Sequence, residues 1–203
     1  MASDPTKLIP PTDDSVAAAV DLNVYDDKGK SVRFGSLFEN ERIIVVFIRH
    51  FFCGVCQDYV TQLASVSPDA LNSANTKIVV IGCGEWELID QYHKDTGFTG
   101  PIYTDPTRKL YRALGMTRES MAGPASGAPK RSYVRGVFSV TMRSIRRGIR
   151  NPLHVGKQGN FSQIGGDLIL GPGNKVSFVH LMENSQDHID VPELMQAAGV
   201  QYP

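Results

Sequence analysis

The sequence predicts one α/β domain with a mixed sheet flanked by helices. Two observations lead to this fold class. Apolar segments of strand length alternate with amphipathic segments of helix length through residues 43–115, the pattern of a sheet built with helical crossovers. Further along, two apolar segments flank a Pro-Gly-Asn turn in residues 167–181, the strongest hairpin signal in the chain. A length of 203 residues suits a single hydrophobic core.

The N-terminal region is expected to contain an arm and a hairpin. Residues 1–15 are rich in proline, aspartate and small polar side chains, which is typical of a flexible arm. A single domain then occupies residues 16–203. Residues 17–38 read as strand, turn, strand, with the turn at residues 27–29, so a β-hairpin opens the domain.

The middle of the chain supplies the alternating elements. Residues 43–48 form a continuous apolar run, which indicates a central strand covered on both faces. An apolar stripe at helical spacing follows in residues 54–66. We then expect a strand at 77–84, a helix at 85–97 that ends at Gly97, a short strand at 101–106, a helix at 107–115 and a last helix at 191–199 with Asp190 as its N-cap.

A basic insertion is expected at about residues 118–160, before the last hairpin. Residues 120–166 contain eight of the 21 cationic side chains and no acidic one, with a possible helix at 133–151. Such an amphipathic basic element suits an acidic protein partner or an anionic membrane surface. The plainer alternative is a solvated face whose apolar stripe packs on the domain. Nucleic acid is not predicted as a partner, because no recognised binding motif accompanies the charge.

Composition narrows the class of protein. The 21 basic and 21 acidic side chains balance, so overall charge indicates no partner. Three cysteines are too few for a disulfide scaffold, and the N-terminus lacks a basic segment followed by an apolar one. No run approaches the roughly 20 apolar residues of a transmembrane helix. We therefore expect a cytoplasmic protein without a membrane-spanning segment or a cofactor.

The main candidate site is the Cys-x-x-Cys sequence at Cys53 and Cys56. Cys53 follows the central strand and precedes the first turn of a helix, where free backbone N–H groups stabilise a thiolate. Its pKa should therefore fall below the ordinary value of about 8.5. Cys56 lies one helical turn later and is placed to resolve a mixed disulfide or a sulfenic acid on Cys53. The pattern predicts a redox-active dithiol.

Two other interpretations of the cysteine pair remain open. The pair could be half of a structural zinc site, but such a site requires a second pair of Cys or His at similar spacing, and Cys83 and the five histidines offer none. The pair could also be two buried structural thiols. Its position between a strand and a helix favours the redox interpretation, and no metal is predicted.

Three neighbours are candidates to assist the pair. Arg49 and His50 precede Cys53, and either cation would lower its pKa. Alternatively, Arg49 pairs with a carboxylate and His50 is a hydrogen-bonding residue. Cys83 ends the next parallel strand, so it could serve as a third redox thiol at the same sheet edge, or it could be a small buried hydrophobe.

Several segments together resemble the peroxiredoxin-like 2 family of AhpC/TSA antioxidant enzyme domains, within the thioredoxin-like superfamily. They are "VVFIRHFFCGVCQDYV", "VVIG", "IYTDPTRKLYRALGM" and "GGDLILGPGNKVSFVHL" followed by "DH". The resemblance runs from about residue 17 to the C-terminus and is weakest across 118–158. It implies a thioredoxin-like, peroxiredoxin-like fold, a cytosolic location, and antioxidant or thiol oxidoreductase activity through Cys53 with Cys56 as its partner.

The chain departs from related families at three positions of the cysteine segment. Peroxiredoxins share a Pro-x-x-x-Thr/Ser-x-x-Cys signature whose hydroxyl orients the peroxide, and here Val46 and His50 take those positions. Thioredoxins share a Trp-Cys-Gly-Pro-Cys turn, and here Val55 replaces the proline. Peroxide activation is therefore expected to be weaker than in a true peroxiredoxin.

A fourth departure lies before the late hairpin. Thioredoxins place a cis-proline there, whereas this chain has Gly165 and Gly166. The glycines would allow close backbone approach of a substrate or of the cysteine turn, with Gln163 as a polar contact. The alternative is a tight loop before a strand.

The function predicted from these observations is a thiol-dependent oxidoreductase. It would reduce disulfides or peroxides through Cys53 and Cys56 and would require an external thiol as reductant. The alternative is a redox-inactive thioredoxin-fold module that docks a partner through its basic insertion.

Overall fold

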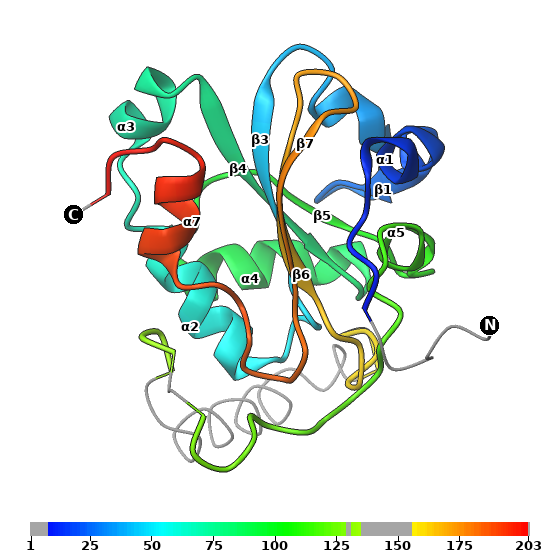
Figure 1. Cartoon of the computed structure of the whole chain (residues 1–203). Helices are drawn as coiled ribbons and strands as arrows, with labels where there is room; N and C mark the ends of the chain where they lie inside the picture. The colour runs from blue at the N-terminus through cyan, green and yellow to red at the C-terminus, as the bar shows by residue number, and fades with distance from the viewer. Residues whose placement is uncertain (1–7, 129–130, 135–155, 203) are drawn as a thin grey trace, which may run out of the picture.

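The computed structural model describes residues 8–128, 131–134 and 156–202. Its strands form one mixed sheet in the order β2-β1-β5-β4-β3-β6-β7 (Figure 1). Their bounds are β1 (Asn23–Tyr25), β2 (Ser31–Arg33), β3 (Arg42–Phe47), β4 (Thr76–Gly82), β5 (Ile102–Thr104), β6 (Gly166–Leu170) and β7 (Val176–Leu181). The predicted α/β class with a mixed sheet is confirmed.

Strand β3 lies inside the sheet, as predicted. It pairs in parallel with β4 and antiparallel with β6, so both of its edges are hydrogen-bonded. The pairs β1–β2 and β6–β7 are the two predicted hairpins, and both are antiparallel. Strand β1 also joins β5, which connects the N-terminal hairpin to the rest of the sheet.

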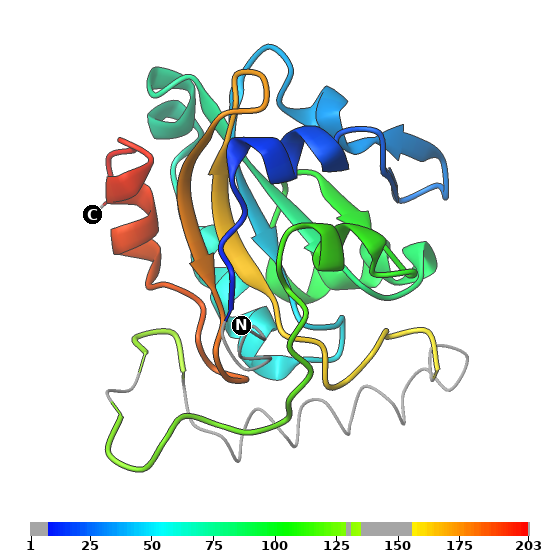
Figure 2. The same ribbon diagram turned by 45° about the vertical axis from the view of Figure 1, so that its right-hand side comes forward.

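Helices cover both faces of the sheet. Their bounds are α1 (Asp13–Ala19), α2 (Gly54–Leu63), α3 (Pro68–Ser73), α4 (Ile89–Thr96), α5 (Lys109–Ala113) and α7 (Val191–Ala197), with short 3-10 turns η1 (Phe34–Leu37) and η2 (Trp86–Leu88). Figures 1 and 2 show α2 and α7 on one side of the sheet and α1 and α5 on the other.

Side-chain alternation along β3 divides the core into two clusters. Ile44, Val46 and Ile48 pack with α2, α4 and α7 in the first cluster. Ile43, Val45 and Phe47 pack with α1 and α5 in the second. This alternation explains why the whole run is apolar, since a strand covered on both faces buries every side chain.

The N-terminal region differs from the sequence prediction. Helix α1 begins inside the stretch expected to be a flexible arm, and the first strand starts only at Asn23. Thr12 caps α1, because its hydroxyl accepts a hydrogen bond from the Ser15 amide at 3.3 Å. Val16 and Ala19 are fully buried in the second cluster. A cap and two buried residues are enough to form a short helix against the core.

The helix predicted at 85–97 is divided between η2 and α4, and its predicted end is confirmed. Helix α4 ends at Gly97, whose φ of 70° is left-handed and suits glycine. Helix α3 was not predicted, because it buries no residue and so leaves no apolar stripe in the sequence. Among the described residues, no helix is long and apolar enough to cross a membrane.

Most of the basic insertion lies outside the described residues. Residues 129–130 and 135–155 belong to that part, so the expected helix at 133–151 and its partner-binding surface stay predictions. Its described flanks, residues 118–128 and 156–164, lie beyond the end of the sheet at which β3 finishes (Figure 2).

Candidate active site

The cysteine turn connects the end of β3 to α2. Cys53 is the N-cap residue of α2, with an extended backbone at φ −70° and ψ 103°. Its amide donates to the His50 carbonyl at 3.0 Å, and the Phe51 amide donates to Gln158 at 3.1 Å. The Gln57 side chain donates to the Phe51 carbonyl at 2.9 Å. These bonds fix the turn to its own helix and to the C-terminal flank of the insertion.

The two sulfur atoms of the turn face each other. The Cys56 thiol donates to the Cys53 Sγ at 2.8 Å, and the Cys56 amide donates to the same sulfur at 3.4 Å. A disulfide bond is about 2.05 Å long, so the sulfurs need to approach by less than ~1 Å to form one. Both cysteines are free, with 5% of Cys53 and none of Cys56 exposed.

The surroundings shift the pKa values of the two cysteines in opposite directions. The hydrogen bond from the Cys56 thiol, followed by the charge of Arg49, lowers the pKa of Cys53 to about 6, although burial acts in the opposite direction. Burial and the neighbouring Cys53 raise the pKa of Cys56 well above its ordinary value. The hydrogen bond and the guanidinium thus favour the anion on Cys53, and burial favours the thiol on Cys56.

Arg49 is the cation of the site. Its Nη1 lies 3.7 Å from the Cys53 Sγ. Three main-chain carbonyls hold the guanidinium, since Nε donates to Gln163 at 3.2 Å and Nη2 donates to Ser120 at 3.3 Å and to Phe161 at 2.7 Å. Within the described part of the chain it forms no ion pair with a carboxylate, so the alternative that it pairs with one is not supported. Its charge is available to the thiolate.

His50 does not supply a second cation. Burial and then the neighbouring Arg49 lower its pKa to about 3, which leaves the imidazole neutral at physiological pH. Its ring packs edge-on against Phe161, with centroids 4.8 Å apart. The cationic role considered for His50 is therefore not supported, because the charged form would lose its hydration beside a buried arginine.

Cys83 lies on the opposite side of the sheet from the cysteine pair. It packs in the core cluster of α1 and α5, whereas Cys53 and Cys56 belong to the cluster of α2 and α7. Its thiol donates to the Arg49 carbonyl at 3.0 Å, and burial raises its pKa to about 11. A protonated thiol facing another cluster does not support the expected third redox role.

Gln163 and the two glycines have neighbours inside the protein. The Gln163 side chain donates to the carbonyls of Met116 at 3.0 Å and Ile164 at 2.8 Å. A Cβ at Gly165 would lie 1.8 Å from the Phe47 carbonyl oxygen, and one at Gly166 would lie 2.8 Å from that of His180. The backbone that approaches the two glycines closely therefore belongs to β3 and β7. This favours the alternative of a tight loop before a strand. The contribution of Gln163 to the site is its own carbonyl, which holds Arg49.

Reasoning from the sequence missed the groups that hold the site together. The Ser120 and Phe161 carbonyls carry no sequence signal, because any residue presents a carbonyl. Outside the contacts of the two sulfurs, Asp167 was also not predicted from the sequence; it lies fully buried in β6 and bonds His188. An aspartate within the apolar segment "GDLIL" was the available signal, since a buried carboxylate requires a partner.

Comparison with known proteins identifies the family. Residues 62–184 match the family model described as AhpC/TSA antioxidant enzyme. The chain belongs to this family. Peroxiredoxin-like 2C of Bos taurus is 40% identical over 187 residues, 92% of this chain and 80% of that protein, and the Homo sapiens protein of the same name is 39% identical over 186 residues, 92% and 81%. Matches of that length include the cysteine turn, although the family model begins after it.

Solved structures support the fold of this AhpC/TSA protein. Peroxiredoxin Q of Xanthomonas campestris superposes with a TM-score of 0.60 at 15% identity, covering 95% of this chain and 93% of that one. Peroxidoxin BcpB of Mycobacterium tuberculosis gives 0.58 at 11% identity, covering 88% and 91%. At such identities the likeness shows a shared thioredoxin-like fold alone. Family and fold together support a thiol-dependent antioxidant oxidoreductase.

Among the described residues, no three His, Cys, Asp or Glu side chains are grouped so that they could hold a metal ion. The Arg49 guanidinium lies 3.7 Å from the Cys53 sulfur instead. Chemically, the arrangement can hold a nucleophilic thiolate at Cys53 beside a thiol at Cys56.

Replacing Arg49 tests its effect on the thiolate. We expect Arg49→Met to raise the midpoint of Cys53 alkylation against pH by about one unit or more, because the nearest positive charge is lost. Arg49→Lys should recover part of the shift. Arg42→Met is the matched control, since Arg42 in β3 also donates to two main-chain carbonyls, Ala74 and Ala198, but is not in contact with the sulfurs. An unchanged midpoint in Arg49→Met would show that Arg49 is only structural.

Proposed function

We propose that this protein is a dithiol oxidoreductase in which Cys53 is the nucleophile and Cys56 the resolving thiol. The observation that carries the proposal is the Cys56 thiol 2.8 Å from the Cys53 sulfur, with the Arg49 guanidinium on the same sulfur. A lowered pKa on the first cysteine and a raised pKa on the second suit a nucleophile and a thiol that reacts afterwards.

The proposed reaction has two steps. The Cys53 thiolate attacks one sulfur of a disulfide, which releases a thiolate that takes up a proton from solvent, or the terminal oxygen of a peroxide, which leaves a sulfenic acid and releases an alkoxide or hydroxide that takes up a proton from solvent. The Cys56 sulfur then attacks Cys53 while its proton passes to the leaving group, which departs as the second thiol or as a water molecule. The product is an intramolecular Cys53–Cys56 disulfide, and an external thiol reduces it again.

Disulfides are the proposed better substrates. A peroxiredoxin-type hydroxyl is missing, since position 50 holds a neutral histidine packed on Phe161. Oxidation by hydrogen peroxide, followed in a stopped-flow instrument, is therefore proposed to be slower than reaction with a small disulfide. A cytoplasmic location is proposed as well, because its thiol pool would supply the external reductant.

The pH dependence of Cys53 alkylation tests the proposed nucleophile. Above its pKa of about 6 the sulfur is a thiolate and reacts at its full rate, and below it the rate falls tenfold per pH unit. Mass spectrometry of the peptide that carries Cys53 after timed iodoacetamide treatment gives the midpoint. Cys83 serves as the internal control, because its buried thiol has a pKa of about 11 and should stay unmodified. A Cys53 midpoint at the value of a free thiol, about 8.5, would count decisively against the proposal.

A further inference from the structure

The two flanks of the insertion are joined to each other next to the cysteine turn. Residues 118–120 and 160–164 form an isolated antiparallel bridge, which we call the flank bridge. Its shortest backbone hydrogen bond runs from the Ser120 amide to the Ser162 carbonyl over 2.6 Å. The insertion therefore begins and ends at one place in the fold.

The flank bridge holds the guanidinium of Arg49. Its Nη2 donates to the Ser120 carbonyl of the first flank at 3.3 Å and to the Phe161 carbonyl of the second at 2.7 Å, and its Nε donates to the Gln163 carbonyl at 3.2 Å. The remaining nitrogen, Nη1, lies 3.7 Å from the Cys53 sulfur. Because both flanks supply carbonyls, the guanidinium keeps this place only while the flanks stay together.

Glu119 fastens the two flanks through its side chain. One carboxylate oxygen accepts hydrogen bonds from the Asn160 side chain and from the Ser162 hydroxyl, each at 3.1 Å. The other oxygen forms an ion pair with Arg108, whose guanidinium also donates to the Gln163 side chain at 3.2 Å. Glu119 on the first flank is thus tied to the second flank by two direct hydrogen bonds and by one path through Arg108.

The Arg108–Glu119 pair differs from an ordinary surface ion pair. Arg108 has a φ of 57°, a left-handed conformation that is uncommon outside glycine and that occurs often at functional sites. Its hydrogen bond lowers the pKa of Glu119, so the carboxylate carries its charge at neutral pH. The Glu119 side chain is 47% exposed and that of Arg108 is 24% exposed, and pairs this exposed add little to stability.

We infer that Glu119 is a positioning residue that keeps the flank bridge closed around the Arg49 guanidinium and thereby sets the reactivity of Cys53, an inference that rests on the proposed function. Glu119 takes no part in the chemistry itself. It acts on the sulfur through the carbonyls that hold Arg49 and through the guanidinium that they hold.

The sign of the expected effect separates positioning from simple electrostatics. Removing a negative charge near a thiolate favours the thiolate, so the lost charge of Glu119 would lower the pH midpoint of Cys53 alkylation. Releasing Arg49 withdraws a positive charge from the sulfur and raises the midpoint. A rise on loss of Glu119 is therefore the result that positioning predicts and that lost charge does not.

Cys53 alkylation against pH, measured in the full chain, tests the inference. We expect Glu119→Ala to raise the midpoint by about 0.5 pH unit or more, which slows alkylation at pH 5 about threefold. Glu119→Gln keeps an oxygen acceptor on a side chain of the same length and should recover part of the shift. In the Arg49→Met background, Glu119→Ala should cause no further rise, because the cation through which it acts is already gone.

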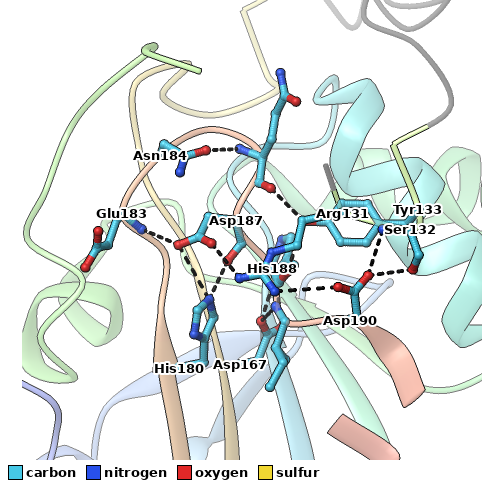
Figure 3. A network of polar contacts seen from close by, with 12 residues as sticks. Arg131, Ser132, Tyr133, Asp167, His180, Glu183, Asn184, Asp187, His188 and Asp190 are labelled. Atoms are coloured by element: carbon cyan, nitrogen blue, oxygen red, sulfur yellow. Dashed lines mark hydrogen bonds and ion pairs between the residues drawn. The ribbon is translucent and has the colours of Figure 1, made fainter. Parts of the chain in front are cut away.

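Asp190→Ala is the matched control. Asp190 fastens another described part of the insertion, as Figure 3 shows, because it accepts hydrogen bonds from the Ser132 amide at 2.8 Å and from the Ser132 hydroxyl, and pairs with Arg131 at 3.6 Å. These contacts match those of Glu119 in kind, a hydroxyl and an arginine, but none of them involves the flank bridge. Loss of this carboxylate should not raise the alkylation midpoint.

Thermal unfolding and the wild-type midpoint complete the test. Glu119→Ala should lower the melting temperature by less than about 4 °C, since the pair is exposed. A low wild-type midpoint that Glu119→Ala leaves unchanged or lowers would overturn the inference alone, and so would an equal rise in the Arg49→Met background. A wild-type midpoint at the value of a free thiol would remove the proposed function as well.

Discussion

Replacing Cys53 by serine is expected to abolish turnover, with a loss of about 10³-fold or more in disulfide reduction. The reason is chemical, because a serine hydroxyl stays protonated where the thiol of Cys53 ionises at a pKa of about 6. The Cys56 thiol has no means of replacing it, since burial and its neighbour hold its pKa far above neutrality. The measurement is steady-state reduction of a small disulfide with an external dithiol as reductant.

Cys56→Ser should separate the two steps of the reaction. Cys53 keeps a hydroxyl donor beside its sulfur, so the first attack continues, but no thiol remains to release the product. Mass spectrometry should then find a stable mixed disulfide on Cys53, or a sulfenic acid after peroxide. Cys83→Ser is the matched control, because its thiol donates to the Arg49 carbonyl on the other side of the sheet and a hydroxyl can do the same.

Together, Cys53→Ser, Cys56→Ser and Cys83→Ser distinguish the proposed dithiol oxidoreductase from a redox-inactive module that only docks a partner. A protein that docks a partner through its basic insertion and uses no thiol would keep its cellular effect in Cys53→Ser and lose it on charge reversal at Arg146 and Arg147. Loss of turnover in Cys83→Ser with full activity in Cys56→Ser would show that Cys83, and not Cys56, is the resolving thiol. That result would contradict the proposed mechanism.

The parts of the structure that could be read from the sequence are those set by local pattern. The apolar run of β3 fixes a strand buried on both faces, and the residues after it place Cys53 at the start of α2. Gly97, with its left-handed backbone, ends α4. The Pro-Gly-Asn turn joins β6 to β7. In each case the cause lies in neighbouring residues, so a short window of sequence contains it.

The surroundings of the sulfurs could not be read in this way. Arg49 is held by carbonyls of Ser120, Phe161 and Gln163, which lie 71, 112 and 114 residues along the chain. The neutral state of His50 likewise depends on burial that only the folded chain creates. Sequence alone indicated that Arg49 and His50 were near Cys53. Which of them stays charged was decided by tertiary contacts.

The expected result for Gly165→Ala is a loss of more than about 4 kcal/mol in the free energy of unfolding, or failure to fold. A Cβ at this position would lie 1.8 Å from the Phe47 carbonyl oxygen, and the sulfur of Met182 would lie 3.3 Å from it. The Phe47 carbonyl belongs to the last residue of β3, so it cannot move without shifting the central strand. Urea or thermal unfolding measures the change.

Gly123→Ala is the matched control for this substitution. Its Cβ would meet only the flexible end of the Gln186 side chain at 3.7 Å, an ordinary contact, so its stability should stay close to that of the wild type. If Gly165→Ala does fold, we expect the backbone two residues earlier, at Gln163, to shift and to weaken the hydrogen bond that Arg49 donates to the Gln163 carbonyl. The midpoint of Cys53 alkylation should then rise as in Arg49→Met. A stable Gly165→Ala protein with an unchanged midpoint would show that neither the strand contact nor the Arg49 support is as close as the structure places them.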